Sequence, residues 1–248
     1  MSRETHTALR QFVLDYGRLR LAEGFASTDP EYARRLPFRD TTGRNAAAWR
    51  LRALHYVVVR AGLALLPNVR RILDVGAGNG WLARRLAGRY RVTALDVDAT
   101  NAGLGALDDP RVHRVRGDLE SLPLAEGSFD VVIVAAALHY CTDLPRALGE
   151  MARVLRPGGV AIIADSPFYS DALSRNRAWQ RTLGYYTAAG VAHLARRYQG
   201  LTRAELDGPR LFRFITLSPG LQPWRAAVGR LRGRDTGARL PVIFGWKR

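Results

Sequence analysis

A group of closely spaced glycines, with an acid just before it, is the part of the sequence most suited to binding a ligand. Gly76, Gly78 and Gly80 follow a short, mostly apolar run at residues 72–75. Glycine lets the backbone turn sharply and approach a ligand closely. Asp74 adds a carboxylate two residues before the first glycine, and a carboxylate favours a cationic ligand over a pyrophosphate. The pattern predicts a binding turn for a ligand that carries positive charge.

The elements around this turn are typical of a nucleotide-binding unit. Residues 71–75 are expected to form a buried strand, and residues 81–87 have the apolar spacing of a helix. The N–H groups at the start of such a helix point at the ligand. A dinucleotide fingerprint needs a third glycine where this chain has Trp81. S-adenosylmethionine (SAM), with a sulfonium, an ammonium and no phosphate, suits the turn better.

The stretch from Arg71 to Ala83, RILDVGAGNGWLA, resembles the class I SAM-dependent methyltransferases, whose motif is an acid, a variable residue and G-x-G-x-G. Further sequence segments as far as Tyr169, among them LPLAEGSFD and RVLRPGG, are also similar to the family, in particular to a bacterial methyltransferase type 11-like group. The resemblance implies an enzyme that takes its methyl group from SAM. The alternative is a glycine turn in some other α/β protein.

Two further acids follow predicted strands at residues 91–96 and 112–116. The resemblance implies that Asp96 holds the ribose hydroxyls and that Asp118 holds the adenine amino group, while Asp98 either shares the ribose or caps the next helix. The cofactor-binding residues that the resemblance implies are Asp74, Gly76, Ala77, Gly78, Asp96, Val97, Asp118, Leu119 and Ala135.

His139 is the candidate catalytic residue. It follows the predicted fourth strand, residues 129–135, on the side where the methyl acceptor is expected. Methyl transfer needs a general base only if the acceptor is protonated at neutral pH, and histidine titrates near that range. The alternative is that His139 packs beside Tyr140 or caps a helix. No spacing of His, Asp or Glu suggests a metal site, so no metal is predicted.

The predicted fold is α/β: a Rossmann-like, seven-stranded, mostly parallel sheet with helices on both faces and an N-terminal helical cap. We expect residues 1–69 to form the cap, with helices at 8–21, 31–36 and 46–66, and residues 70–248 to form the SAM-binding methyltransferase domain. Late strands are expected at 210–217 and 240–246, the last one antiparallel. The remaining C-terminal segments are expected to be a helix at 174–198, loop and helix at 219–232, and an exposed loop with Gly233, Asp235 and Gly237.

The cap is expected to roof the acceptor site, because a small substrate does not exclude water by itself. The cap residues expected nearest the pocket are Tyr32, Trp49, Arg50 and His55, with Arg50 as the guess for the partner of the cofactor carboxylate. His139 and Tyr169 are expected on the sheet side. The alternative is a cap that packs away from an open cleft.

The net charge is +16, and Lys247 is the only lysine, so nearly all of the basic side chains are arginines. A basic surface attracts nucleic acid, anionic membranes or acidic substrates, but here the arginines are spread along the chain without a long basic run. A small-molecule substrate is therefore favoured, and the alternatives are an RNA or protein methyltransferase or a non-catalytic SAM-binding protein. The single cysteine, Cys141, rules out an internal disulfide. No apolar run suggests a membrane span or a secretory signal, so a cytoplasmic protein is expected.

Overall fold

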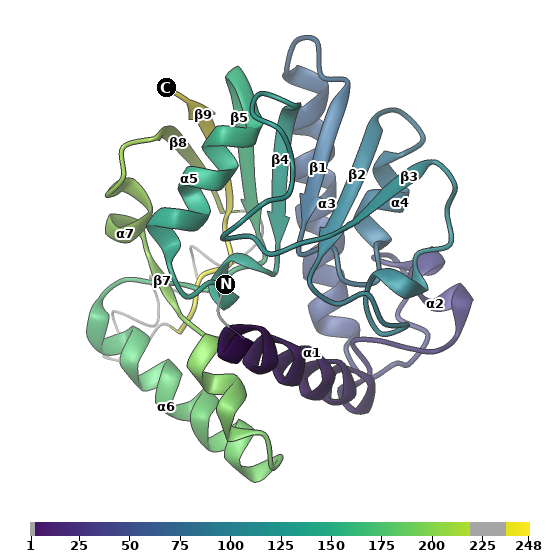
Figure 1. Cartoon of the computed structure of the whole chain (residues 1–248), viewed down its shortest axis with the longest axis vertical. Coiled ribbons are helices and arrows are strands. Elements are labelled where there is room, and N and C mark those ends of the chain that lie inside the picture. Colours follow the sequence, from purple (N-terminus) through teal and green to yellow (C-terminus); the bar gives the residue numbers. More distant parts are fainter. Residues whose placement is uncertain (1–2, 219–236) are drawn as a thin grey trace.

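One seven-stranded sheet runs through the computed structural model, which describes residues 3–218 and 237–248 (Figure 1). The strand order is β3-β2-β1-β4-β5-β9-β8. Strands β1 to β5 pair in parallel, and β9 is antiparallel to both of its neighbours. The prediction of a mostly parallel seven-stranded sheet with a reversed last strand is confirmed. Its strands are β1 (Arg71–Val75), β2 (Arg91–Asp96), β3 (Val112–Arg116), β4 (Phe129–Ala135), β5 (Leu155–Ala164), β8 (Phe212–Leu217) and β9 (Val242–Lys247).

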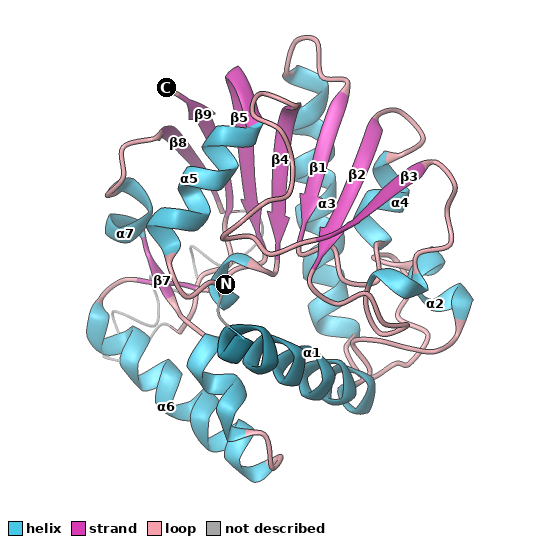
Figure 2. Ribbon diagram, viewed as in Figure 1, coloured by secondary structure: helices cyan, strands magenta, loops and turns pink. Residues whose placement is uncertain are grey.

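The helices and the remaining short elements surround this sheet (Figure 2). A second, two-stranded parallel sheet pairs β6 (Phe168–Tyr169) with β7 (Leu201–Thr202) and was not predicted. The α-helices are α1 (Arg3–Glu23), α2 (Pro30–Arg35), α3 (Ala46–Leu65), α4 (Trp81–Leu86), α5 (Leu144–Val154), α6 (Ala172–Ala188) and α7 (Arg203–Asp207). The 3-10 helices are η1 (Leu104–Ala106), η2 (Leu138–Tyr140) and η3 (Ala192–Arg197).

The central strands are apolar on both faces because both faces are covered. In β1, Leu73 and Val75 belong to a buried cluster with residues of α5, whereas Ile72 belongs to a second cluster with residues of α3 and α4. Successive side chains of a strand point to opposite faces. Parallel sheets covered on both faces show such continuous apolar runs, and the prediction of helices on both faces is confirmed.

The two long N-terminal helices have different positions. Helix α3 packs on a sheet face through Tyr56, Val59 and Leu63. Its Gly62 lies so close to the Phe244 ring that an added Cβ would be 2.4 Å from it. Helix α1 instead runs across the end of the sheet where the parallel strands finish (Figure 1), and it packs against η3.

Some predicted boundaries differ in the C-terminal third. The helix expected over 174–198 is divided into α6 and η3, because Gly190 between them has a φ of 73°. Strand β5 begins at Leu155, and its pairing with β4 shifts register between Leu155 and Val160. The loop and helix expected at 219–232, together with Gly233 and Asp235, lie outside the described residues.

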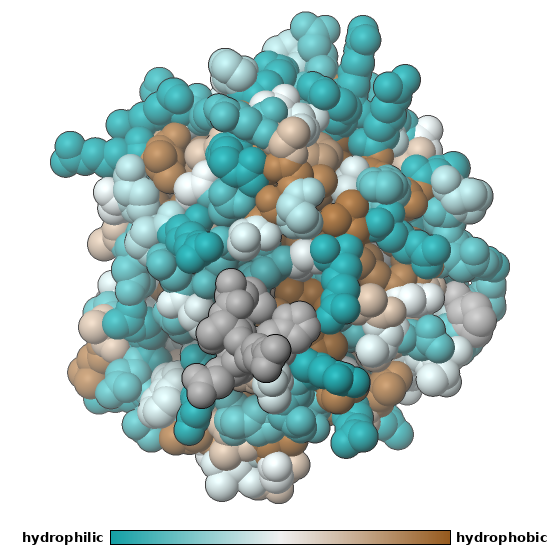
Figure 3. Space-filling view, viewed as in Figure 1, coloured by the Kyte–Doolittle hydropathy of each residue, from teal (hydrophilic) through white to brown (hydrophobic). Residues whose placement is uncertain are grey.

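The charged side chains of the described part are distributed over several elements. Ion pairs occur within α1, α2 and α5, and between α4 and the loop before β3. On the face shown in Figure 3, hydrophilic side chains cover most of the area and apolar ones appear between them. Within residues 3–218 and 237–248, no helix combines the length and the apolar character that crossing a bilayer requires.

Candidate functional site

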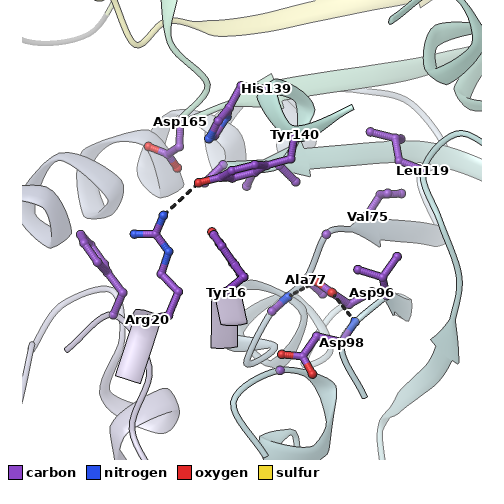
Figure 4. A pocket seen from close by; sticks show the side chains of 18 of the residues that line it. Tyr16, Arg20, Val75, Ala77, Asp96, Asp98, Leu119, His139, Tyr140 and Asp165 are labelled. Atoms are coloured by element: carbon purple, nitrogen blue, oxygen red, sulfur yellow. Dashed lines mark hydrogen bonds between the residues drawn. The ribbon is translucent and has the colours of Figure 1, made fainter. Parts of the chain in front are cut away.

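A cavity of about 520 Å³ lies at the carboxyl ends of the parallel strands (Figure 4). In open α/β sheets ligands bind at this edge, where the strand order reverses. Here the order reverses between β1 and β4. The wall is made by the ends of β1 to β5, the turn after β1, and residues of α1, α3 and η3.

Residues 76–80, the glycine turn, bring the backbone to the cavity wall. Gly76, Gly78 and Gly80 have φ values of 70°, 53° and 72°, in the left-handed region that favours glycine. A Cβ at Gly76 would lie 2.2 Å from the Ala137 Cβ, whereas nothing lies within 4 Å of a Cβ placed at Gly78. Gly76 therefore permits close packing against the end of β4, and Gly78 leaves open space beside the turn.

Two carboxyl groups stand beside this turn, that of Asp74 buried and that of Asp96 half-buried. Asp74 is 1% exposed, and its Oδ2 has no hydrogen-bond partner among the described residues. Burial, and then the Asp96 carboxylate, raise the pKa of Asp74 to about 7. Asp96 accepts hydrogen bonds from the backbone N–H groups of Gly78 and Asp98, both at 2.8 Å, and burial raises its pKa to about 6. The site thus holds closely spaced acids that a cationic ligand would neutralise.

The next acids are tied to their own turns. Asp98 accepts from the backbone N–H of Thr100 at 2.8 Å, which closes a local turn. It does not cap the next helix, because η1 begins at Leu104 and has no side-chain cap. Asp118 accepts from the backbone N–H of Glu120 at 3.0 Å. The nine predicted cofactor residues and His139 all line the one cavity: Asp74, Gly76, Ala77, Gly78, Asp96, Val97, Asp118, Leu119, Ala135 and His139.

Aromatic residues of α1 and η2, with Tyr198 directly after η3, close one side of the cavity, and we call α1 and η3 the roof. The Tyr16 and Tyr140 ring centroids are 5.1 Å apart, and those of Tyr140 and Tyr198 are 5.9 Å apart. Arg20 Nη2 donates to the Tyr140 hydroxyl at 2.9 Å, and Arg20 Nη1 forms an ion pair with Glu23 at 2.6 Å. The charge of Arg20 is therefore balanced, and its side chain ties α1 to the end of β4.

A second arginine, Arg52 of α3, lines the cavity without a carboxylate partner among the described residues. Its guanidinium lies over the Trp49 ring, 4.5 Å from the centroid, and buried Trp49 Nε1 has no partner in the described chain. Arg50, the residue guessed from the sequence, is exposed and does not line the cavity. Residues two apart on a helix point about 200° away from each other. Tyr32 and His55, also expected nearest the pocket, do not line the cavity. Tyr32 is buried beside Trp49 and donates to Gly24 O.

His139 is buried between aromatic rings. Its Nδ1 lies 3.2 Å from Ser166 Oγ, and its ring centroid lies 4.3 Å from that of Tyr140. Burial, with Arg20 and Arg52 nearby, lowers the pKa of His139 to about 3. The ring is therefore neutral at physiological pH and a weak base. This packing beside Tyr140 is the alternative predicted for His139.

One pair at the site was not predicted. His55 Nδ1 of α3 lies 2.7 Å from Oδ1 of Asp165, the residue that follows β5. Asp165 lines the cavity, and its side chain is 7% exposed. An acid directly after a predicted strand was the available signal, since Asp96 also ends its strand. Among the described residues, no group of three or more His, Cys, Asp or Glu side chains is arranged to hold a metal ion.

Comparisons with known proteins give three findings. A family profile described as "Methyltransferase domain" matches residues 73–163. The Malonyl-[acyl-carrier protein] O-methyltransferase of Serratia marcescens is 34% identical over 184 residues, which cover 70% of this chain and 71% of that protein. The enzyme of the same name from Pectobacterium atrosepticum is 41% identical over 127 residues, so the chain spans 49% of that relative's length.

Solved structures show the same fold. The geranyl diphosphate C-methyltransferase of Streptomyces coelicolor A3(2), solved with Mg²⁺, geranyl diphosphate and S-adenosyl-L-homocysteine, has a TM-score of 0.59 at 15% identity. The match covers 81% of this chain and 78% of that one.

Proposed function

The chain belongs to the class I SAM-dependent methyltransferases, and on this premise we propose that it transfers the methyl group of SAM to a small-molecule acceptor. The observation that carries the proposal is the buried, unpartnered Asp74 oxygen beside the glycine turn. A buried polar atom without a partner costs free energy unless a ligand satisfies it. The ammonium of SAM supplies both a donor and the opposite charge.

The other predicted cofactor residues take complementary roles in this proposal. Asp96 accepts hydrogen bonds from the ribose hydroxyls, and Asp118 accepts one from the adenine amino group, next to the N–H of Leu119. The backbone of Gly76, Ala77 and Gly78 passes along the cofactor, for which the open space at Gly78 leaves room. Val97 and Ala135 are apolar walls of the same cavity.

Arg52 is the proposed partner of the cofactor carboxylate. It is a cation on the cavity wall that lacks an anionic partner within the described chain. Its position over Trp49 holds the guanidinium plane, and a guanidinium binds a carboxylate with two parallel hydrogen bonds. The Trp49 ring also lies 5.8 Å from that of Trp81, the residue that starts α4 after the glycine turn, so Arg52 belongs to the cofactor end of the cavity.

The chemistry is an in-line displacement. SAM supplies an activated methyl group and a neutral leaving group, so the chain mainly has to align donor and acceptor and to exclude water. The roof provides that enclosure with Phe12 and Tyr16 of α1 against Tyr140. The role of His139 as general base stays a prediction, weakened by its low pKa.

A small acceptor fits the size of the cavity. Ligand pockets commonly measure about 300–1,000 Å³, and this one, at about 520 Å³, has limited space beside a cofactor. The names of the curated relatives describe methylation of an oxygen, so oxygen is the first acceptor atom to test. A cytoplasmic location and the lack of a nucleic-acid partner are part of the same proposal.

The test uses the purified chain with methyl-labelled SAM. Calorimetry is expected to give a micromolar dissociation constant for SAM, about −8 kcal/mol, and label is expected to enter small molecules of a mixed acceptor library. Total RNA and denatured protein, supplied separately, are expected to stay unlabelled. A chain that does not bind SAM, or that labels only RNA or protein, would overturn the proposal.

A further inference from the structure

The carboxyl edge of the sheet has two halves. Asp74, Asp96 and Asp118 stand at the ends of β1, β2 and β3, and we call this part the cofactor half. The ends of β4 and β5 form the other part, the acceptor half, which carries His139 and Asp165. In Figure 4, Asp165 lies on the same side of the cavity as His139 and Arg20, away from Asp96 and Asp98. A polar group on the acceptor half is placed to meet the methyl acceptor.

Asp165 is held in a fixed orientation. Its Oδ1 is 2.7 Å from Nδ1 of His55, a residue that is 1% exposed. The backbone of Asp165 has a φ of 56°, a left-handed conformation that is uncommon for residues other than glycine, asparagine and aspartate.

The second oxygen of Asp165 distinguishes this pair from a purely structural link between α3 and β5. The carboxylate lines the cavity, and its Oδ2 has no hydrogen-bond partner among the described residues. A carboxylate that served only to fasten the helix would be expected to be satisfied on both oxygens. Here one oxygen is anchored and the other is available to a ligand.

The charges around Asp165 indicate the kind of ligand. Arg20 is neutralised by Glu23, and Arg52 is assigned above to the cofactor carboxylate. His139 stays neutral because its pKa is lowered to about 3. Among the described residues, Asp165 is the acidic side chain that lines the acceptor half of the cavity, and a carboxylate acts only as a hydrogen-bond acceptor. The group beside it has to bring a proton.

We propose that Asp165 is an acceptor-binding catalytic residue, that His55 is its positioning residue, and that the methyl acceptor is a proton-bearing group, a hydroxyl or an amine. The inference rests on the proposed methyl transfer from SAM. A lone pair of the acceptor oxygen or nitrogen forms the new bond to the methyl carbon, and the carbon–sulfur bond breaks with its electron pair left on sulfur. The proton released by the acceptor passes to the Asp165 carboxylate.

A binding experiment tests the charge without an identified acceptor. Sinefungin carries an amine where SAM carries its methyl-sulfonium, and S-adenosylhomocysteine (SAH) lacks both. We measure the ratio of the dissociation constants of SAH and sinefungin in wild type, Asp165→Asn and Glu126→Gln. Glu126→Gln is the control: it removes one negative charge from an exposed loop just before β4, at the amino ends of the strands and away from the cavity.

A carboxylate near the ammonium is expected to favour sinefungin, and Asp165→Asn is expected to lower the ratio at least about tenfold. Its SAH affinity and the ratio in the Glu126→Gln control are expected to remain at the wild-type values. An unchanged ratio in Asp165→Asn, with SAH still bound, would overturn the inference and leave the proposed function standing. If the wild-type protein does not bind SAH, the proposed function is wrong.

Two His55 variants test the positioning role and cover the case in which Asp165→Asn fails to fold. His55→Asn keeps a donor near the position of Nδ1, and His55→Ala removes it. The ratio is expected to be largely kept in His55→Asn and lost in His55→Ala, at similar SAH affinity. Equal ratios in both variants would overturn the positioning role.

Acceptor chemistry is tested with labelled SAM and three sets of small molecules that offer hydroxyls, amines or carboxylic acids. The expected products are methyl ethers if the acceptor atom is oxygen and methylamines if it is nitrogen. The kcat of Asp165→Asn is expected to fall by more than its KM rises. Methyl esters of carboxylic acids as the sole products would overturn the inference, because those acceptors carry no proton at neutral pH.

Discussion

Lowering the pH from 7 to 5 is expected to weaken the binding of SAM through Asp74. Burial raises the pKa of this carboxyl group to about 7 in the cofactor-free chain. The ammonium of SAM binds the ionised form, so the proton has to leave Asp74 when the cofactor arrives. The amino group of SAM, with an ordinary α-amino pKa of about 7.7–8.0, stays protonated throughout this range.

The size of the effect follows from the ionised fraction. With a pKa of about 7, about half of Asp74 is ionised at pH 7 and about 1% at pH 5, which corresponds to an affinity about 50-fold lower at pH 5. Asp96, whose pKa is raised to about 6, loses its charge over the same interval and acts in the same direction. Near pH 6, Asp74 alone is expected to release about 0.9 proton on binding, and Asp96 about 0.5 more.

Isothermal titration calorimetry at several pH values, in buffers of different ionisation enthalpy, measures both the affinity and the proton release. Asp74→Asn is expected to bind SAM more weakly at pH 7, by ~1–3 kcal/mol, and to retain only the pH dependence that Asp96 contributes. Asp96→Asn is the companion variant. It keeps a dependence due to Asp74, moved to lower pH because the Asp96 carboxylate helps to raise the pKa of Asp74. A constant affinity between pH 5 and 7, with no proton exchanged, would refute the reasoning.

The same raised pKa has a consequence for folding. Between about pH 4 and 7, Asp74 binds more protons in the folded chain than in the unfolded chain, because its pKa is raised on folding. Its contribution to stability is therefore present at low pH and is lost as the pH rises through about 7. Asparagine has the shape of the protonated acid. The cofactor-free Asp74→Asn variant is therefore expected to melt at a higher temperature than wild type at pH 8, and a lower melting temperature would contradict this.

Three further variants probe other parts of the structure. Arg52→Gln is expected to weaken SAM binding by ~1–3 kcal/mol through loss of a charge-assisted contact. The control Arg50→Gln, at an exposed position of the same helix, is expected to bind SAM like wild type. Equal losses of SAM affinity in the two variants, measured by calorimetry, would contradict the assignment of Arg52 to the cofactor carboxylate. Gly76→Ala is expected to abolish SAM binding, because its Cβ would collide with the end of β4 at 2.2 Å, and a dissociation constant within about threefold of wild type would contradict that close approach. Gly62→Ala is expected to lower the free energy of unfolding, measured in urea, by ~1–3 kcal/mol, because the added methyl group overpacks against Phe244. This loss is expected to exceed the gain from the better helix propensity of alanine. An increase in stability would show that the Phe244 ring moves aside.

The cofactor half of the site could be predicted from the sequence because its signals are local. The glycine turn, the apolar run of β1 and the acids that end β2 and follow β3 lie within short stretches whose structure depends on nearby residues. The order of the parallel strands follows from the resemblance and from the chirality of their crossovers. Asp74, Asp96 and Asp118 meet because the carboxyl ends of neighbouring parallel strands share an edge.

The acceptor half depends on contacts between distant positions. His55 and Asp165 are separated by 110 residues, and only the placement of α3 against the sheet brings them together. Arg50 was predicted to lie at the pocket, but Arg52 lines the cavity instead. The packing of α3 on the sheet decides which face of the helix meets the cavity, and the sequence alone does not give that rotation. The strands β6 and β7 have only two residues each, too few to show an alternating pattern.

The division between sheet and roof also affects how such a chain can diverge during evolution. The roof helices α1 and η3 supply wall residues, Phe12, Tyr16 and Arg197 among them, but none of the proposed partners of the cofactor. Substitutions there change the shape offered to an acceptor while the acids of β1 to β3 keep their geometry. Helix α3 is constrained differently, since Arg52 and His55 lie one turn apart and are proposed to serve opposite halves of the cavity. A lineage that acquires new substrates would therefore accumulate changes in the roof and preserve this one helical turn.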